Sequence, residues 1–185
     1  MNRYQFLIAL LTLFSSATNS LAAEAESQFK LAEQGNAKAQ SYLGTMYAFG
    51  HGVKMDKKEA AKWFLKAAEQ GDIIAQYNLA MLFHSGEGVA KNEEETVKWL
   101  QKAADQGHAL AQYNLGTEYY HGRGAPKNYV EAAKWYRKAA EQGNYMAQTN
   151  LGNMYLNGEG VPKDEAEAKK WLLKAAAIKN PKVAN

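Results

Sequence analysis

The stretch that decides the fold is AQSYLGTMYAFGHGVKMDKKEAAKWFLKAAEQGDII (39–74), because its pattern returns three more times at a fixed period of 36 residues. The later copies begin at Ala75, Ala111 and Ala147, without an insertion. The tryptophans of the chain fill one column of this alignment: Trp63, Trp99, Trp135 and Trp171. A repeat of this length predicts a solenoid or a similar array of stacked units.

Each copy predicts two helices. The first carries an apolar stripe at Ala39, Leu43, Met46 and Tyr47 and stops at the glycine pair 50/52. The second begins with an acidic or amide residue followed three positions later by glutamate, the pattern of a capping box. It recurs as Asp56 with Glu59, Asn92 with Glu95, Asn128 with Glu131, and Asp164 with Glu167. A glycine closes the second helix in three copies, at Gly71, Gly107 and Gly143, and Gly35 holds the same place before the first copy.

Residue sizes predict how these helices pack. Gly44, Ala67 and Ala68 allow a close approach, and the tryptophan fills the space between layers. One copy cannot bury its own apolar stripe, so stability must come from stacking. We expect a half-repeat cap at 24–38, in which 24–34 aligns with the second helix alone. The repeats are expected at 39–74, 75–110, 111–146 and 147–185, with Pro181 ending the last helix.

The pattern Ala-x-x-x-Leu-Gly-x-x-Tyr (147–155), Gly-x-Gly-Val (158–161) and Asp-x-x-Glu-Ala-x-x-Trp (164–171), with Lys-Ala-Ala-Glu-x-Gly (138–143), resembles the Sel1-like repeat family. That family is a branch of the tetratricopeptide-like solenoids. The resemblance implies an all-α, right-handed superhelical solenoid whose concave face is lined by the first helix of each pair. Members are typically adaptors or scaffolds, and exported bacterial members are linked to envelope functions or host contact.

Three residues depart from the pattern. Ala80 replaces the glycine after leucine, and Ala125 replaces valine. Glu118 stands in a column otherwise held by methionine or leucine. We expect Glu118 either at the edge of the stack, which we favour, or at a polar spot on the binding face.

The first 23 residues differ from the rest. Arg3 precedes an apolar run (6–14) and a small-residue segment that ends at Ala22 and Ala23, the layout of a secretory signal peptide. The alternative is an uncleaved N-terminal helix. We expect cleavage after Ala22 or Ala23 and a periplasmic or secreted protein. No cysteine occurs, which excludes disulfides, thiol catalysis and a lipoprotein anchor. The net charge of +3 gives no reason to expect nucleic acid, and the expected mature chain has no apolar run long enough to span a membrane.

Polar and aromatic columns on the first helices are the candidate partner site. Asparagines precede the repeat leucine, and glutamines lie beside them. In peptide-binding tetratricopeptide solenoids a similarly placed asparagine holds the ligand's backbone, and its amide can both donate and accept. The alternative is that both columns bond between helices within the stack. The candidate residues are Asn78, Asn114, Asn150, Gln76, Gln112, Gln148, Tyr77, Tyr113, His84 and Tyr120.

Lysines form a double column on the second helices, four residues apart: Lys62, Lys98, Lys134 and Lys170, with Lys66, Lys102, Lys138 and Lys174. This column predicts a solvated face balanced by glutamates, and the alternative is a site for an anionic polymer.

Enzyme motifs are weak. Ser27 and Lys30 match a β-lactamase Ser-x-x-Lys element, but no Ser-Asp-Asn or Lys-Thr-Gly companion occurs. The four histidines share no metal-ligand spacing, although His84 and His121 could approach across adjacent repeats.

We therefore expect a non-catalytic scaffold without cofactor or metal. Its partner would be a protein or peptide, and a monomer is favoured. The alternatives are an envelope hydrolase and a polysaccharide-binding protein.

Overall fold

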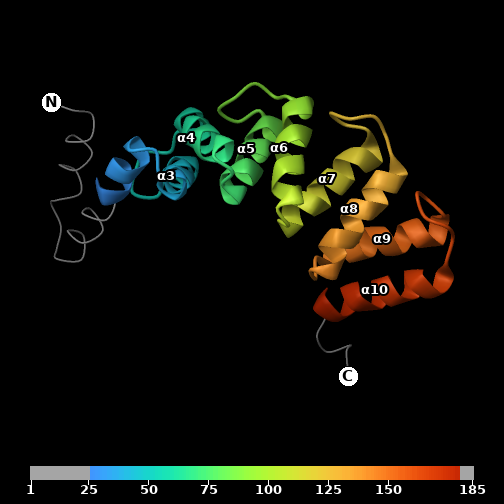
Figure 1. Cartoon of the computed structure of the whole chain (residues 1–185). Coiled ribbons are helices and arrows are strands. Elements are labelled where there is room, and N and C mark those ends of the chain that lie inside the picture. Colours follow the sequence, from blue (N-terminus) through green and yellow to red (C-terminus); the bar gives the residue numbers. More distant parts are fainter. Residues whose placement is uncertain (1–25, 180–185) are drawn as a thin grey trace. The chain divides into compact units, whose positions relative to one another are not determined.

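Helices make up the regular structure of residues 26–179, the part of the chain that the computed structural model describes (Figure 1). A helix over 26–33 comes first, where the half-repeat cap is expected, and no strand occurs between residues 26 and 179. The longer helices are α3 (Ala37–Phe49), α4 (Lys57–Glu69), α5 (Ile73–Ser85), α6 (Glu93–Asp105), α7 (Ala109–His121), α8 (Tyr129–Glu141), α9 (Tyr145–Asn157) and α10 (Glu165–Lys179). The all-α class is confirmed. The predicted signal peptide, at 1–23, and Pro181 lie outside the described residues.

The chain divides into an N-terminal unit, Met1–Lys91, and a C-terminal unit, Asn92–Asn185. In the N-terminal unit α3 packs on α4, and α4 packs on α5. In the C-terminal unit each helix from α6 to α10 packs on the next. Helix A (α3, α5, α7 and α9) and helix B (α4, α6, α8 and α10) therefore alternate as predicted. No described helix combines the length and the apolar character that crossing a bilayer requires.

Each helix A begins at a polar residue that the sequence pattern left unnoticed. The side chain of this residue accepts a hydrogen bond from the backbone N–H three positions later, which satisfies one of the otherwise unpaired donors of the first turn. The four caps are Asn36, Asp72, His108 and Asn144. At the other end, helix A stops at a glycine in the left-handed conformation, such as Gly50 with a φ of 73°.

Each helix B begins at the predicted cap, but only half of the capping box forms. Asp56 Oδ1 accepts from the backbone N–H groups of Lys58 and Glu59, and the bond from Glu59 is the main reason why the pKa of Asp56 is lowered. The reciprocal bond is absent, because the backbone N–H of Asp56 donates to the carbonyl of Tyr47 at 2.9 Å. The N–H groups of Asn128 and Asp164 are used in the same way.

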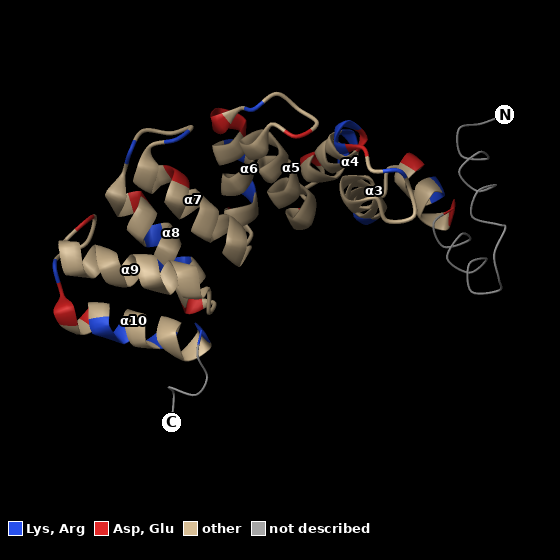
Figure 2. Cartoon of the chain, turned by 180° about the vertical axis from the view of Figure 1, so that it is seen from behind, with Lys and Arg blue, Asp and Glu red and all other residues tan. Residues whose placement is uncertain are grey.

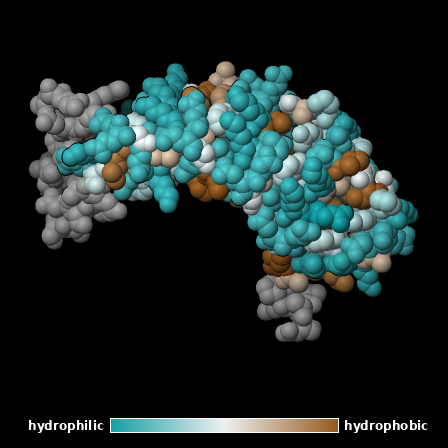
Figure 3. Space-filling view, in the orientation of Figure 1, coloured by the Kyte–Doolittle hydropathy of each residue, from teal (hydrophilic) through white to brown (hydrophobic). Residues whose placement is uncertain are grey.

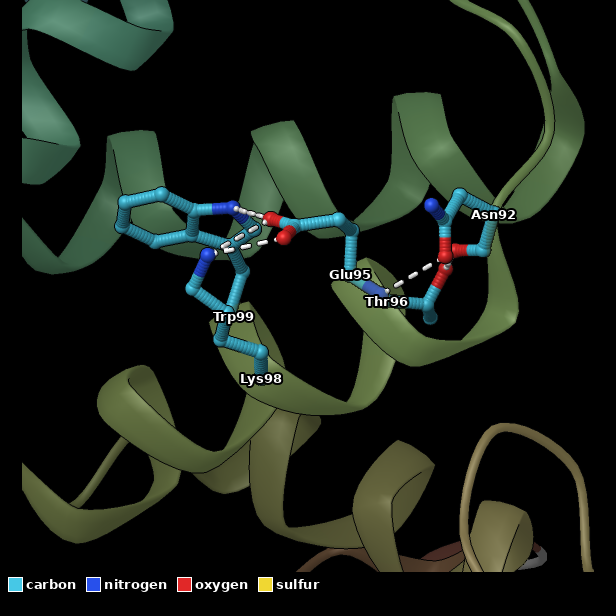
Figure 4. Close-up of polar contacts among 5 residues, drawn as sticks. All are labelled: Asn92, Glu95, Thr96, Lys98 and Trp99. Carbon is cyan, nitrogen blue, oxygen red and sulfur yellow. Dashed lines mark hydrogen bonds and ion pairs between the residues drawn. The ribbon is translucent and has the colours of Figure 1, made fainter.

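The capping-box glutamate turns instead toward its own helix. In α6, Glu95 accepts from the Lys98 ammonium at 2.8 Å and from the indole N–H of Trp99 at 2.9 Å (Figure 4). Asn92 caps the same helix by accepting from the backbone N–H of Glu95 at 3.0 Å. The indole N–H groups of the other three tryptophans, Trp63, Trp135 and Trp171, are buried with no hydrogen-bond partner.

Small residues and large rings form the core as predicted. The repeat leucines and the four tryptophans are buried. A Cβ at Gly44 of α3 would lie 2.5 Å from Cδ1 of Phe64 on α4, so this contact requires glycine. Truncation of a buried tryptophan to alanine should cost about 3–5 kcal/mol in the free energy of unfolding, because it leaves a large cavity.

The turn between helix A and helix B touches the preceding repeat. At Gly124 in the C-terminal unit, a Cβ would overlap the backbone carbonyl of Glu93 at the start of α6. Gly52, at the same place in the first repeat, would meet Cε of Met46 at 3.4 Å and no other atom of residues 26–179. Both glycines have positive φ, 67° and 72°. The second glycine of the turn in repeat 3 is thus a stacking contact with the preceding helix B.

Glu118 corrects the expectation for its column. It lies neither at an edge nor on an open face, because only 3% of it is exposed. Its carboxylate takes two hydrogen bonds from the Arg123 guanidinium, at 2.9 and 3.1 Å. This bond raises the pKa of Arg123. The repeat tolerates a charge at this position because the turn supplies the matching cation.

Charge separates the two kinds of helix. Helix α9 has no Lys, Arg, Asp or Glu, whereas its neighbour α10 carries several of both signs (Figure 2). Most of the surface seen in Figure 3 is hydrophilic, with small separate apolar patches. A weakly charged helix A surface is therefore available for contacts that do not depend on net charge.

Candidate functional site

The predicted glutamine column is structural. Gln76, Gln112 and Gln148 are each only 4% exposed, and each donates its side-chain amide to a backbone carbonyl of the preceding helix B at 3.0–3.1 Å. A partner cannot reach these groups without opening the stack. The alternative reading, bonding between helices, is therefore the right one for the glutamines, and we remove them from the candidate site.

These glutamines belong to chains of amides that join successive helices. Gln142 at the end of α8 donates to Gln112 on α7 at 2.7 Å, and Gln112 donates in turn to the carbonyl of Ala104 on α6. The N-terminal unit repeats the pattern with Gln70, Gln40 and Ala32. Paired in this way, buried amides add both stability and direction to the stack.

The asparagines occupy a different environment. Asn78, Asn114 and Asn150 are half-buried on helix A. Asn150 lines a pocket together with Tyr136, and Asn78 borders another pocket. The predicted aromatic neighbours Tyr77, Tyr113 and Tyr120 are also half-buried, and His84 is exposed. This part of the predicted set remains accessible at the surface.

The C-terminal unit has a pocket of about 220 Å³ that collects three of the predicted residues, Tyr113, Tyr120 and Asn150. Tyr136 of α8 also lines it, and its hydroxyl bonds Thr117 at 3.1 Å. The Tyr120 hydroxyl donates to Glu159 Oε2 at 3.0 Å. Burial and then this bond raise the pKa of Tyr120, which keeps its hydroxyl protonated at neutral pH. We call this the C-terminal pocket.

The N-terminal unit has a pocket of about 310 Å³ that collects Asn78 and His84. Phe49 and Phe64 supply its aromatic wall, and Lys57 its positive charge. We call this the N-terminal pocket. A third hollow, of about 370 Å³, lies between α9 and α10 and also borders Tyr113 and Asn150.

The lysine columns are engaged within each helix B. The first column pairs with the capping-box glutamates at 2.8–3.1 Å. The second column covers the tryptophan rings, with the ammonium groups 4.1–4.5 Å from the ring centroids. These contacts favour the solvated-face interpretation, because each ammonium already faces a carboxylate or an aromatic ring.

The structure does not bring the residues of the enzyme-like and metal-like motifs together into a site. Ser27 and Lys30 are both exposed on the helix over 26–33, and none of the three pockets includes either. No group of three metal-ligating side chains occurs within residues 26–179. His84 and His121 belong to different units, and His108 is the α7 cap.

Sequence reasoning missed two residues that shape the C-terminal pocket. Tyr136 stands where the first repeat has Phe64, and Glu159 stands in the variable place between the two turn glycines. Tyr136 differs from the apolar residues Phe64, Leu100 and Leu172 of its column, and the column of Glu159 varies in charge, with Glu87 at the same place in repeat 2. A comparison of variable columns, in place of shared ones, would have found them.

Four segments, 37–72, 73–108, 109–144 and 146–180, match the Sel1 repeat profile. The chain belongs to the Sel1 repeat family. No curated protein matches it. Sel1 repeats typically mediate protein–protein interactions, and the proteins that carry them are mostly non-catalytic scaffolds.

Three solved structures are similar. A protective antigen of uropathogenic Escherichia coli with an SLR fold shares 41% identity at a TM-score of 0.80, over 82% of this chain and 32% of its own. A Sel1 repeat protein from Oxalobacter formigenes shares 42% at 0.76, over 84% and 45%. Helicobacter pylori cysteine rich protein B shares 27% at 0.54, over 73% and 97%. The chain thus spans less than half the length of the first two proteins.

Proposed function

We propose that this chain is an exported, non-catalytic scaffold that binds a protein or peptide partner through its helix A surface. One observation carries the proposal: in each unit, a pocket lined by aromatic rings opens beside an asparagine of helix A. An extended peptide needs paired donors and acceptors for its backbone and apolar recesses for its side chains. Asn78 with the N-terminal pocket and Asn150 with the C-terminal pocket offer both.

The scaffold role also fits the chemistry of the two helix types. The lysines of helix B contact glutamates and tryptophan rings of the same helix. Few of its charged groups therefore remain for a ligand. Helix A carries the exposed aromatic and amide groups that protein interfaces favour. Partner affinity should therefore depend on helix A and change little with the lysine columns.

The test begins with a partner captured from envelope extracts by the chain. Its affinity is then measured against the triple variant Asn78→Ala, Asn114→Ala and Asn150→Ala. We expect a loss of about tenfold or more, because each asparagine contributes hydrogen bonds worth about 1 kcal/mol. Circular dichroism checks that the helices persist.

A control changes helix B in three successive repeats, with Lys62→Gln, Lys98→Gln and Lys134→Gln. These lysines make exposed ion pairs, so the fold should tolerate the change. Loss of binding in the lysine variant with an unchanged asparagine variant would reverse the assignment and favour an anionic polymer as ligand.

Export is proposed from the signal-peptide layout of residues 1–23. Fractionation of the producing cells and N-terminal sequencing of the exported chain test it. The expected first residue is Ala23 or Glu24. An intact Met1 on a cytoplasmic protein would remove this part of the proposal.

A further inference from the structure

The N-terminal and C-terminal pockets are the same site two repeats apart. Their linings align residue by residue in the 36-residue register: Asn78 with Asn150, Phe64 with Tyr136, and Glu87 with Glu159. Each pair comes from the same helix or turn of its repeat. The two pockets can therefore be compared position by position, although they lie in different units.

The N-terminal pocket is already occupied by a cation of the chain itself. The Lys57 ammonium lies 3.2 Å from Glu87 Oε2 and 5.4 Å from the centre of the Phe49 ring. A carboxylate and an aromatic face are the two surroundings that stabilise an ammonium group. The chain thus shows what this site accommodates.

The C-terminal pocket lacks that internal cation. Tyr129 stands in the place of Lys57, and its ring packs 5.0 Å from the ring of Tyr120. Glu159 is half-buried and accepts hydrogen bonds from Tyr120 and Asn157, but within residues 26–179 no Lys, Arg or His forms an ion pair with it.

Nearby cations are committed elsewhere. Arg123 is held by Glu118 at 2.9 Å, which leaves that pair without net charge. The Lys127 ammonium lies 4.6 Å from the centre of the Tyr129 ring, and the Lys163 ammonium pairs with Glu165 at 3.6 Å. The pocket lining contains one carboxylate, three tyrosine rings and the imidazole of His121, which packs 5.2 Å from the Tyr120 ring, and it contains no lysine or arginine.

We propose that the C-terminal pocket binds a cationic side chain of a protein or peptide partner, a lysine or arginine, between Glu159 and the tyrosine rings of Tyr113, Tyr120 and Tyr136. The inference rests on the proposed scaffold function and names the partner chemistry that this pocket selects. The partner group takes the role that Lys57 plays in the N-terminal pocket. The pocket selects a cationic side chain over a neutral one, because only a cation places an opposite charge beside the Glu159 carboxylate.

The test uses a defined probe, Nα-acetyl-lysine methylamide, titrated into the full chain and followed by the backbone amide NMR signals of residues 158–160. Nα-acetyl-norleucine methylamide, of similar length and without charge, is the matched ligand. We expect the lysine probe to bind about tenfold or more tightly than the norleucine probe, with an affinity that falls as salt increases. Equal binding of the two probes would overturn the proposal.

Variants exploit the equivalence of the pockets. Glu159→Gln should weaken binding of the lysine probe about tenfold. Glu87→Gln should leave the probe-induced shifts at 158–160 unchanged, because Glu87 lines the N-terminal pocket. Tyr129→Lys places an internal lysine where the N-terminal pocket has one, and it should abolish binding at 158–160. Unchanged probe affinity in both Glu159→Gln and Tyr129→Lys would refute the assignment.

The reciprocal variant, Lys57→Met, should create a second site. It removes the internal cation, so the lysine probe should now also shift the signals of residues 86–88. Failure here would show that the carboxylate and ring alone do not make a cation site, which would count against the proposal. If the lysine probe does not bind while partner binding still depends on the asparagines, the cation inference is wrong and the scaffold function stands. If the probe binds but no partner depends on the asparagines, the cation site stands and the proposed scaffold function is wrong.

Discussion

Repeats 1 (37–72) and 3 (109–144) have the same order of helices and turns, but they place side chains of different polarity at several equivalent positions. Repeat 1 has Met46 in its core, and repeat 3 has Glu118 held by Arg123. The ring on helix B is Phe64 in repeat 1 and Tyr136 in repeat 3. The comparison teaches that the plan depends on backbone contacts and ring volume, while individual core positions can exchange an apolar group for a satisfied polar one.

The largest difference should lie at the second turn glycine. Gly124→Ala should cost about 4 kcal/mol or more in the free energy of unfolding, because its Cβ would overlap the carbonyl of Glu93. Gly52→Ala should cost about 1–2 kcal/mol, the penalty for a left-handed residue, because within residues 26–179 its Cβ would meet only Cε of Met46. Urea unfolding measures both. Equal losses would mean that the turn does not support stacking.

Moving the ion pair into repeat 1 tests whether the polar core is self-contained. Met46→Glu should cost about 3 kcal/mol, because the carboxylate would be buried without a partner. His51 stands where Arg123 stands in repeat 3, so adding His51→Arg should recover at least half of the loss. The reverse change, Glu118→Met, should cost less than about 1 kcal/mol. No rescue by the arginine would contradict the exchange.

The ring on helix B should show a smaller effect. Tyr136→Phe removes the hydroxyl that donates to Thr117, and it should cost about 1 kcal/mol in the free energy of unfolding. Phe64→Tyr is the matched change in repeat 1, where Thr45 and Asn78 occupy the corresponding places, and it should be nearly neutral. Thermal unfolding compares the pair. A gain in stability from Tyr136→Phe would contradict the hydrogen-bond assignment.

The smallest effect should be a pH dependence confined to repeat 3. Burial lowers the pKa of His108 from 6.5, and its Nδ1 accepts from the backbone N–H of Ala111 at 3.2 Å. The folded protein thus binds fewer protons here than the unfolded chain. The stability from this cap is complete above pH 6.5 and is lost as the pH falls through the lowered folded pKa.

His108→Asn gives this cap the residue found at Asn36 and Asn144, which does not titrate. Urea unfolding between pH 7.5 and 5 should show that this variant loses less stability than the parent chain. Parallel curves for the two proteins would exclude a contribution of the cap.

The sequence was sufficient for the elements and their order. Period, glycine positions and caps such as Asp56 specify local structure, because they act within a single turn of chain. The buried tryptophans followed from the need of each repeat to cover its neighbour. These features depend on residue type and spacing alone.

The sequence could not show which hydrogen-bond partner each polar side chain takes. Glu59 fits a capping box by spacing, but the backbone N–H that it would bind is taken by Tyr47, whose position depends on the folded turn. Gln112 resembles a surface amide until the carbonyl of Ala104 is seen beside it. Asn150 stayed in the candidate site because it lies at a pocket edge, which only tertiary structure defines.

The amide chains give the stack a polarity with a consequence for its last repeat. In each repeat the helix A glutamine donates to a backbone carbonyl of the preceding helix. These hydrogen bonds therefore point in one direction along the sequence and set the order in which repeats stack. In repeat 4 the amide chain is incomplete: Oε1 of Gln148 is buried without a donor, and Ile178 stands where Gln70 and Gln142 stand in earlier repeats. Glutamine at 178 would supply this donor from within repeat 4, as Gln142 supplies Gln112 within repeat 3, so the amide chain of the final repeat can be completed by one substitution.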